Sequence, residues 1–255
     1  MNKKVQLDCA WKFNVLNVYN YTQLHGTYYP LVEFIRDKGR FLEGDILEAG
    51  TFKGRLTAGL ATLLREIGSS KIIHTYDTFE GFPGYSEKDD YQEFSRQYES
   101  GLITEKHWEA INQFFEIRES ILKTTVNVKN ISSSMDFSEN SLDFVIEKFN
   151  LLGLENVIIH QGKFEETMTA SEKGPNKLFL TIVDCDLYDG YSTTLPYVWP
   201  ITVPGGMIFL DEYYSLKFPG PRYAVNEFLS GIKDFEMTNI ARKDDDFERW
   251  AIIKK

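Results

Sequence analysis

The sequence predicts an α/β fold built on a mostly parallel, Rossmann-like sheet, and two observations support this class. Short runs of β-branched and large apolar residues alternate with longer segments of helical periodicity, which is the pattern of repeated strand–helix–strand units. The run at 178–184 is apolar along nearly its whole length, as expected of a central strand that helices cover on both faces. We therefore expect one open sheet between two layers of helices.

The strands and helices are expected in a regular order along the chain. β-rich runs predict strands at 44–50, 71–77, 156–162, 178–184 and 206–211. Apolar residues that recur on one helical face predict helices at 53–67, 141–152 and 222–232. Two late runs, 235–241 and 247–253, flank an acidic turn at 243–246 and predict an antiparallel pair that closes the edge of the sheet.

Two segments lie outside this alternation. The first, residues 1–40, is aromatic and has a helical pattern from about residue 11, which predicts a helical cap over the sheet. The second, residues 84–140, is rich in Glu, Ser, Gln and aromatic residues, with a helix expected at about 105–121. A long insertion in a compact domain is usually functional, and we give equal weight to an active-site lid and an oligomerisation arm.

Composition limits the organisation of the chain and its partners. With 255 residues, 42% of them hydrophobic, the chain has enough material for one core, and we expect a single domain over 1–255. The formal net charge of -10 argues against nucleic acid or an anionic membrane as the main partner. Two cysteines far apart predict neither a disulfide framework nor a zinc cluster, and no signal peptide or membrane span is evident. The expected setting is cytoplasmic, and the sequence is compatible with a homodimer.

Carboxylates fall at or near the C-terminal ends of several predicted strands. They are Glu48, Asp77, Asp184 and Asp211. Ligands of open α/β sheets bind in the crevice beyond these ends, so the four are expected to line one crevice. A single acidic residue at a strand end often caps a helix or forms a turn. Four acidic residues, each at or near the C-terminal end of a different predicted strand, favour a functional site.

The turn after the first strand suits a ligand that lacks a pyrophosphate group. Gly50 and Gly54 allow a sharp turn and a close approach of the backbone to a ligand. Their spacing differs from the G-x-G-x-x-G pattern of dinucleotide-binding folds, which argues against a nicotinamide-dependent oxidoreductase. Asp77 follows the second strand, where a carboxylate accepts the two hydroxyls of a ribose, although it could instead cap the residues that follow it.

The strongest cluster of acidic residues joins two strand ends. Asp184 follows one strand, and Asp211 and Glu212 follow another that is expected to lie nearby in the sheet. Three converging carboxylates repel one another unless a cation neutralises them. A hard divalent cation with oxygen ligands, magnesium or calcium before zinc, is the expected occupant. The histidines are scattered and are not expected to be ligands: His25, His74, His107 and His160.

Together with their neighbours, these residues resemble the macrocin O-methyltransferase (TylF/MycF-like) family. Members of this family methylate hydroxyls of deoxysugars on macrolides and related natural products. The resemblance covers about 40–83 and 141–230. Its motifs are Gly44–Gly54, Tyr76–Pro83, Gly162–Thr167, Asp184–Tyr188, Val203–Tyr213 and Gly220–Phe228. Their order is specific for the family and does not identify the substrate.

The resemblance implies a class I methyltransferase fold, S-adenosylmethionine as the methyl donor, and usually a bound magnesium ion. It implies that the methionine part of the donor lies against Glu48, Ala49, Gly50, Thr51, Gly54 and Thr57. It implies ribose contacts from Asp77, Thr78 and Phe79, and adenine contacts from Gly162, Lys163 and Phe164. By the same resemblance, Asp184 contacts the donor, binds the metal and acts as the general base, with Asp211 and Glu212 completing the metal site.

The chain departs from the family pattern at three places. Cys185 replaces the usual glycine of Asp-Gly-Asp-Leu-Tyr, Glu212 replaces the second aspartate of Asp-Asp-Tyr, and the 84–140 insertion is longer than expected. The expected function is a metal-assisted O-methyltransferase that acts on a hydroxyl of a sugar or glycosylated small molecule. The alternatives are a catechol-type O-methyltransferase and a methyltransferase-like scaffold that binds a partner through the insertion.

Overall fold

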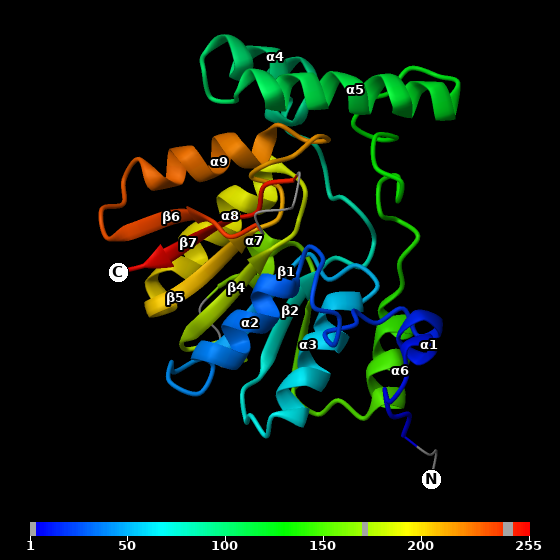
Figure 1. The fold of residues 1–255 in the computed structure, drawn as a ribbon, viewed down its shortest axis with the longest axis vertical. Coiled ribbons are helices and arrows are strands. Elements are labelled where there is room, and N and C mark those ends of the chain that lie inside the picture. Colours follow the sequence, from blue (N-terminus) through cyan, green and yellow to red (C-terminus); the bar gives the residue numbers. More distant parts are fainter. Residues whose placement is uncertain (1–3, 170–172, 242–246) are drawn as a thin grey trace.

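A mixed sheet forms the centre of the molecule (Figure 1). The computed structural model describes residues 4–169, 173–241 and 247–255, so the acidic turn expected at 243–246 lies outside the described residues. The sheet has seven strands in the order β3-β2-β1-β4-β5-β7-β6. Their bounds are β1 Asp45–Ala49, β2 Ile73–Asp77, β3 Val157–Gln161, β4 Leu178–Val183, β5 Thr202–Leu210, β6 Phe235–Asn239 and β7 Trp250–Lys254.

The pairing of the strands confirms the predicted fold class. Strands β1 to β5 pair in parallel, whereas β7 runs antiparallel to both β5 and β6 and closes the sheet. The chain adds β2 and β3 on one side of β1, then returns to add β4 and β5 on the other side. The carboxyl ends of β1 and β4 therefore form the switch point at which open α/β sheets bind ligands.

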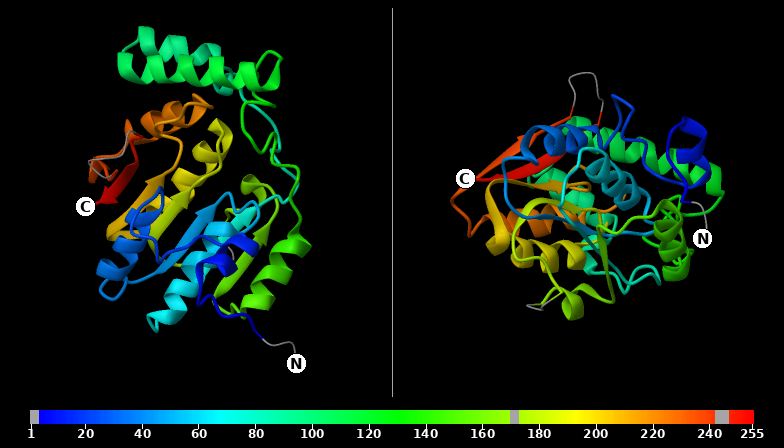
Figure 2. Two further views of the ribbon diagram at one scale, coloured as in Figure 1. Left: turned by 45° about the vertical axis from the view of Figure 1, so that its right-hand side comes forward. Right: turned by 90° about the horizontal axis from the view of Figure 1, so that it is seen from below.

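Helices cover both faces of the sheet (Figures 1 and 2). One face packs against α1 Ala10–Val15, α2 Tyr29–Lys38, α3 Arg55–Glu66 and α6 Leu142–Leu152. The other face packs against α7 Phe164–Thr167, α8 Tyr188–Ile201 and α9 Gly220–Leu229. No helix in the described part of the chain is both long and apolar enough to cross a membrane.

The two cores explain why the central strands carry so few polar residues. Successive side chains of a strand point to opposite faces, so Ile46 packs in the core beside α2 and α3, and Leu47 packs in the core beside α8 and α9. All residues of β4 are buried, which confirms the expectation for the apolar run at 178–184. The polar residues available for chemistry are therefore displaced to the strand ends.

The N-terminal cap contains less helix than the sequence predicts. Residues 11–40 form the short α1 and α2 with irregular backbone between them. The intervening chain docks on α3, where the Tyr19 N–H donates to the carbonyl of Arg55 at 2.9 Å. A Cβ added to Gly59 of α3 would lie 2.5 Å from the carbonyl oxygen of Tyr19. Backbone-to-backbone packing, which leaves no helical period in the sequence, thus holds the cap in place.

The sequence analysis missed α8 and placed the start of β5 too late. Two prolines, Pro196 and Pro200, lie inside α8 and argue against a helix by their intrinsic preference. Burial of one face of α8 overrides this preference, with Tyr191, Leu195 and Val198 all fully buried. The strand β5 begins at Thr202, ahead of the glycine pair at which the expected strand begins.

The 84–140 insertion lies beyond the carboxyl edge of the sheet (Figures 1 and 2). We call residues 84–122 the arm and residues 123–140 the strap. The arm contains the 3₁₀ helix η1 Glu87–Asp89, α4 Gln92–Glu99 and α5 Glu105–Leu122, and α5 agrees with the helix predicted at 105–121. The two segments share a third hydrophobic cluster with Leu187 and Phe218, which come from loops of the sheet.

The docking of the cap on α3 predicts an unusual effect of Gly59→Ala. Alanine favours a helix over glycine by about 1 kcal/mol. The clash with the carbonyl of Tyr19 should nevertheless lower the free energy of unfolding by about 1–3 kcal/mol. Urea denaturation measures the change, and Gly231→Ala, where the nearest atom to an added Cβ lies 3.9 Å away, is the control. A stabilised Gly59→Ala protein would contradict this packing.

Candidate functional site

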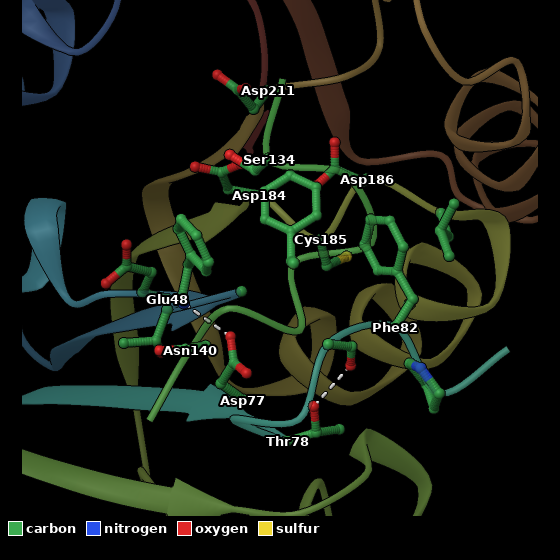
Figure 3. Close-up of a pocket in the computed structure, with 18 of the residues that line it drawn as sticks. Glu48, Asp77, Thr78, Phe82, Ser134, Asn140, Asp184, Cys185, Asp186 and Asp211 are labelled. Carbon is green, nitrogen blue, oxygen red and sulfur yellow. Dashed lines mark hydrogen bonds between the residues drawn. The ribbon is translucent and has the colours of Figure 1, made fainter. Parts of the chain in front are cut away.

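A cavity of about 870 Å³ opens at the carboxyl ends of β1 and β4. This volume lies in the usual range for small-molecule sites. All four strand-end carboxylates named above line it, which confirms that they share one crevice. Figure 3 shows Asp184, Asp186 and Asp211 near one another and Asp77 with Thr78 in another part of the pocket.

Gly50 allows the ends of β1 and β4 to approach closely. Its φ is +94°, a left-handed conformation that favours glycine. A Cβ at this position would lie only 1.7 Å from the carbonyl oxygen of Asp184. Gly54, with φ +65°, forms the N-cap of α3, so the turn between these glycines passes from the strand directly to the start of a helix. Gly50 and Thr51 line the cavity.

Asp77 joins the loops that follow β1 and β2. One carboxylate oxygen accepts the N–H of Phe52 at 2.7 Å, and the other accepts the N–H of Phe79 at 2.6 Å. Both donors have positive φ, 47° and 58°. Burial raises the pKa of Asp77, and these backbone hydrogen bonds oppose the shift. Asp77 therefore forms the turn that the sequence allowed as an alternative, while also lining the cavity.

Glu48 is a buried carboxylate in the wall of the same cavity. Burial raises its pKa to about 8; the hydroxyl of Thr57, which donates a hydrogen bond to it, lowers the pKa, and the charge of Asp77 raises it. Burial therefore favours the protonated form of Glu48 at neutral pH. A cationic group beside Glu48 would favour its ionised form at neutral pH.

The other residues expected to contact a donor fall into two groups. Thr78, Lys163 and Phe164 line the main cavity, and Gly162 lines an adjoining cavity of about 430 Å³. Four expected residues do not line the main cavity and support it from behind: Ala49, Gly54, Thr57 and Phe79. Ala49 is fully buried in the sheet, Thr57 bonds to Glu48, and the backbone of Phe79 bonds to Asp77.

Asp184, Asp211 and Glu212 converge as the sequence predicts. One ligand atom from each lies within 4.8 Å of those of the other two. Burial, reinforced by the charge of Asp211, raises the pKa of Asp184 and of Glu212 well above the ordinary range. Oδ1 of Asp211 is buried and has no hydrogen-bond partner among the described residues. An all-oxygen donor set with an orphaned buried oxygen fits a hard divalent cation such as Mg²⁺.

Two tyrosines that the sequence analysis missed hold these carboxylates. The hydroxyl of Tyr28, at the N-cap of α2, donates to Oδ2 of Asp184 at 2.9 Å. The hydroxyl of Tyr191, in the first turn of α8, lies 2.7 Å from Oε2 of Glu212. Neither tyrosine has a signal in the sequence, because each reaches the site from a segment whose position depends on tertiary packing.

Asp186 and Lys217 form a second missed pair at the acidic end of the cavity. Their Oδ1 and Nζ atoms lie 3.7 Å apart, and both residues line the cavity. Burial raises the pKa of Asp186, while the ammonium of Lys217 opposes the shift. The Asp-x-Asp spacing of Asp184 and Asp186 was the available signal, since the first of them was already assigned to the site.

The arm is anchored to the loop that carries Lys217. The side-chain amide of Gln97 donates to the carbonyl of Pro219 at 2.8 Å. Nε2 of His107 lies 2.8 Å from the carbonyl of Ser215, and burial lowers the pKa of His107 to about 4, so its neutral ring donates this bond. These buried contacts fix the loop after β5 against the insertion.

The strap closes the opposite wall of the cavity. Phe137 packs against Phe52 and Phe82, with ring centroids 5.1 and 5.0 Å apart. Arg118 of α5 donates to the carbonyls of Asn130 and Ser132, at 2.8 and 2.7 Å from its terminal nitrogen. Strap residues that line the cavity are Ser132, Ser133, Ser134, Phe137 and Asn140. The strap part of the insertion therefore forms part of the cavity wall.

The chain resembles known proteins in sequence pattern and in fold. A protein-family model described as a methyltransferase domain matches residues 47–213. The solved structure of the O-methyltransferase NovP is 18% identical, with a TM-score of 0.60, and the match covers 96% of this chain and 79% of that one. The calicheamicin methyltransferase CalS11 is 14% identical, with a TM-score of 0.55, and 96% and 77% are covered. At these identities the structures show a shared fold. Comparison with curated proteins finds no match.

The raised pKa of Glu48 predicts how stability depends on pH. Between about pH 4.5 and 8, the folded protein holds a proton on Glu48 that the unfolded chain releases. The protonated Glu48 side chain contributes in full to the free energy of unfolding below its pKa in the unfolded chain, about 4.5. This contribution is lost as the pH rises through about 8, its pKa in the folded protein. The wild-type free energy of unfolding should therefore fall, relative to that of Glu48→Gln, by about 1.4 kcal/mol per pH unit. Urea unfolding across this range measures the difference, and parallel pH profiles would disprove it.

Proposed function

The chain belongs to the methyltransferase domain family, and from this premise we propose that it is an S-adenosylmethionine-dependent, divalent-metal-assisted O-methyltransferase. The acceptor is a hydroxyl of a sugar or of a glycosylated small molecule. The observation that carries the proposal is the convergence of Asp184, Asp211 and Glu212 around an orphaned carboxylate oxygen, in the same cavity as Asp77 and the Gly50 turn.

The donor is assigned to the end of the cavity that Gly50 and Asp77 form. Asp77 is available to a ribose through carboxylate lone pairs that its two backbone hydrogen bonds leave free. Glu48 is suited to the α-ammonium group of the methionine part, because a buried carboxylate with a raised pKa ionises when a cation enters. We assign the adenine to Lys163 and Phe164, which line the same cavity.

The metal is assigned to Asp184, Asp211 and Glu212. A bound divalent cation supplies positive charge that orients an acceptor hydroxyl and stabilises its alkoxide character. Without such a cation, these three carboxylates would repel one another; burial raises the pKa of Asp184 and of Glu212, and the charge of Asp211 adds to the shift. The longer side chain of Glu212, where the family resemblance leads us to expect aspartate, still reaches the other two ligands.

We assign proton acceptance and metal binding to different carboxylates. The resemblance gave both roles to Asp184, yet this carboxylate already accepts the Tyr28 hydroxyl and would also hold the cation. Asp186 lies outside the ligand set and beside Lys217, whose charge favours the ionised form. We therefore assign proton acceptance to Asp186, and the cavity walls position the acceptor oxygen in line with the donor methyl group.

The sugar acceptor rests on the resemblance to the macrocin O-methyltransferase family. Polar strap residues, among them Ser133, Ser134 and Asn140, give the cavity hydrogen-bonding groups suited to a polyhydroxylated acceptor. NovP is described as an O-methyltransferase and CalS11 as a calicheamicin methyltransferase, which agrees with this class of chemistry. Methylation of a catechol and not of sugars would support the catechol-type alternative.

The first test is isothermal titration of S-adenosylhomocysteine into the protein, with Mg²⁺ and then with a chelator. We expect micromolar binding in both conditions, because Glu48, Asp77 and the Gly50 turn, which we assign to the donor, are not metal ligands. Binding justifies a screen of sugar acceptors with Mg²⁺ present, and addition of the chelator should abolish turnover. Absence of binding in both conditions would favour the non-catalytic scaffold.

Asp77→Ala tests the donor site. Loss of a carboxylate that holds two loops and a ribose should weaken binding of S-adenosylhomocysteine by about tenfold or more. The same titration measures the change. Glu236→Gln, on the exposed surface of β6, is the control and should bind as the wild type does. If Asp77→Ala bound S-adenosylhomocysteine with unchanged affinity, Asp77 would be a turn-forming residue without a role in donor binding.

Asparagine variants separate the two proposed roles at the acidic end. Asp186→Asn should bind Mn²⁺ and S-adenosylhomocysteine normally and lose turnover by about 10²–10⁴-fold. Asp184→Asn should retain S-adenosylhomocysteine binding and lose both metal binding and turnover. Activity on an acceptor from the screen, with metal binding followed by electron paramagnetic resonance, measures these effects. Normal turnover in Asp186→Asn would show that Asp186 is not the proton acceptor and would favour Asp184 in that role. Normal turnover in Asp184→Asn would show that Asp184 is needed neither as a metal ligand nor as a proton acceptor.

A further inference from the structure

We propose that the hydroxyls of Tyr28 and Tyr191 select the size of the cation at the acidic site. Each hydroxyl occupies one lone pair of one oxygen of a ligand carboxylate and disfavours a second contact of that oxygen with the ion, so that Asp184 and Glu212 are each biased toward offering a single oxygen. The inference rests on the metal site of the proposed function and goes beyond it, because it concerns which ion the site prefers. Both tyrosines are positioning residues in this account.

Tyr191 holds Glu212 at two points. Its hydroxyl lies 2.7 Å from Oε2 of Glu212 and accepts the backbone N–H of the same residue at 3.0 Å. The hydroxyl is also 2.9 Å from the carbonyl of Val183, the last residue of β4. Tyr191 is fully buried, so it has no alternative rotamer in solvent. The carboxylate oxygen is nearer than the carbonyl, so the single hydroxyl proton is assigned to the carboxylate.

Tyr28 holds Asp184 from the opposite side of the sheet edge. Its hydroxyl donates to Oδ2 of Asp184 at 2.9 Å. The ring is held edge-on by Phe209 of β5 and by Tyr19 of the cap, with centroids 6.2 and 5.6 Å away. The direction of the hydroxyl is therefore set by the packing of the cap. Asp211 differs from the other two ligands, since its Oδ1 lacks a partner.

The number of free oxygens matters because cations differ in the ligands they need. Mg²⁺ and Mn²⁺ favour about six oxygens in an octahedron with one oxygen from each carboxylate, whereas Ca²⁺ takes about six to eight and often binds a carboxylate through both oxygens. The two tyrosine hydroxyls oppose bidentate binding by Asp184 and Glu212. The site is thereby biased toward a small ion, with positions left for water and an acceptor oxygen.

The presence of a glutamate at position 212 fits this arrangement. The longer side chain gives Glu212 more rotational freedom than aspartate has, so a monodentate geometry needs an additional constraint. Tyr191 supplies it by contacting both the carboxylate and the backbone N–H of Glu212. The constraint comes from α8, an element separate from the strand ends that carry the ligands.

Metal titrations of Tyr191→Phe and Tyr28→Phe test the inference without catalysis. Mn²⁺ affinity is measured from the electron paramagnetic resonance signal of the free ion, and Ca²⁺ affinity from its competition with Mn²⁺. Loss of a hydrogen-bond partner around a metal site typically changes affinity by about 10–100-fold. We expect the ratio of the Ca²⁺ to the Mn²⁺ dissociation constant to fall by about tenfold in each variant, because the freed oxygen favours the larger ion.

Tyr21→Phe is the matched control. Tyr21 is also buried and donates its hydroxyl to a carboxylate, that of Glu66 at 2.6 Å, outside the proposed metal site. Its ion preference should equal that of the wild type, and circular dichroism establishes that each variant is folded. An unchanged ratio in the two site variants, or an equal fall in the control, would overturn the selection role. Absence of saturable Mn²⁺ binding by the wild type would instead overturn the metal site of the proposed function.

Discussion

Electrostatic repulsion among the buried carboxylates at the ends of β4 and β5 is the constraint on which the rest of the site depends. Asp184, Asp186, Asp211 and Glu212 share a region of low solvent access, where like charges destabilise one another strongly. The protein offsets this repulsion only in part, with two tyrosine hydroxyls and one ammonium group, that of Lys217. The compensating groups come from the cap, α8 and the loop after β5, so parts of the chain far apart in sequence must fold together to form the site.

The 84–140 insertion fixes the segments that surround this cluster of carboxylates. Contacts from Gln97 and His107 fix the loop that carries Lys217, while Arg118 fixes the strap over the opposite wall. Helix α5 therefore bridges both sides of the cavity, since His107 lies near one end of it and Arg118 near the other. A segment with these buried polar contacts acts as a structural support of the pocket. This accounts for a separate small hydrophobic cluster at a distance from the main cores.

The features that depend on the local sequence pattern were predicted from the sequence. The features that depend on tertiary packing were missed. The parallel strands, the closing antiparallel pair and the shared crevice of Glu48, Asp77, Asp184 and Asp211 follow from hydrophobic runs and the position of acidic residues after them. Helix α8 was missed because its prolines contradict local preference, and burial of one face overrides them. Tyr28 and Tyr191 were missed for a related reason. A tyrosine in an aromatic segment has no property in sequence that distinguishes a core ring from one whose hydroxyl reaches a carboxylate.

The site combines charge repulsion with strained backbone. Phe52, Phe79 and Asp186 all have positive φ, a conformation that is unfavourable for residues other than glycine. The N–H groups of Phe52 and Phe79 donate hydrogen bonds to Asp77, which fix these two loops without a ligand. A ligand that supplies positive charge relieves the repulsion without having to reorganise these loops. A ligand that binds the folded and not the unfolded chain also stabilises the fold, so a cation bound by these carboxylates would raise the free energy of unfolding that their mutual repulsion lowers.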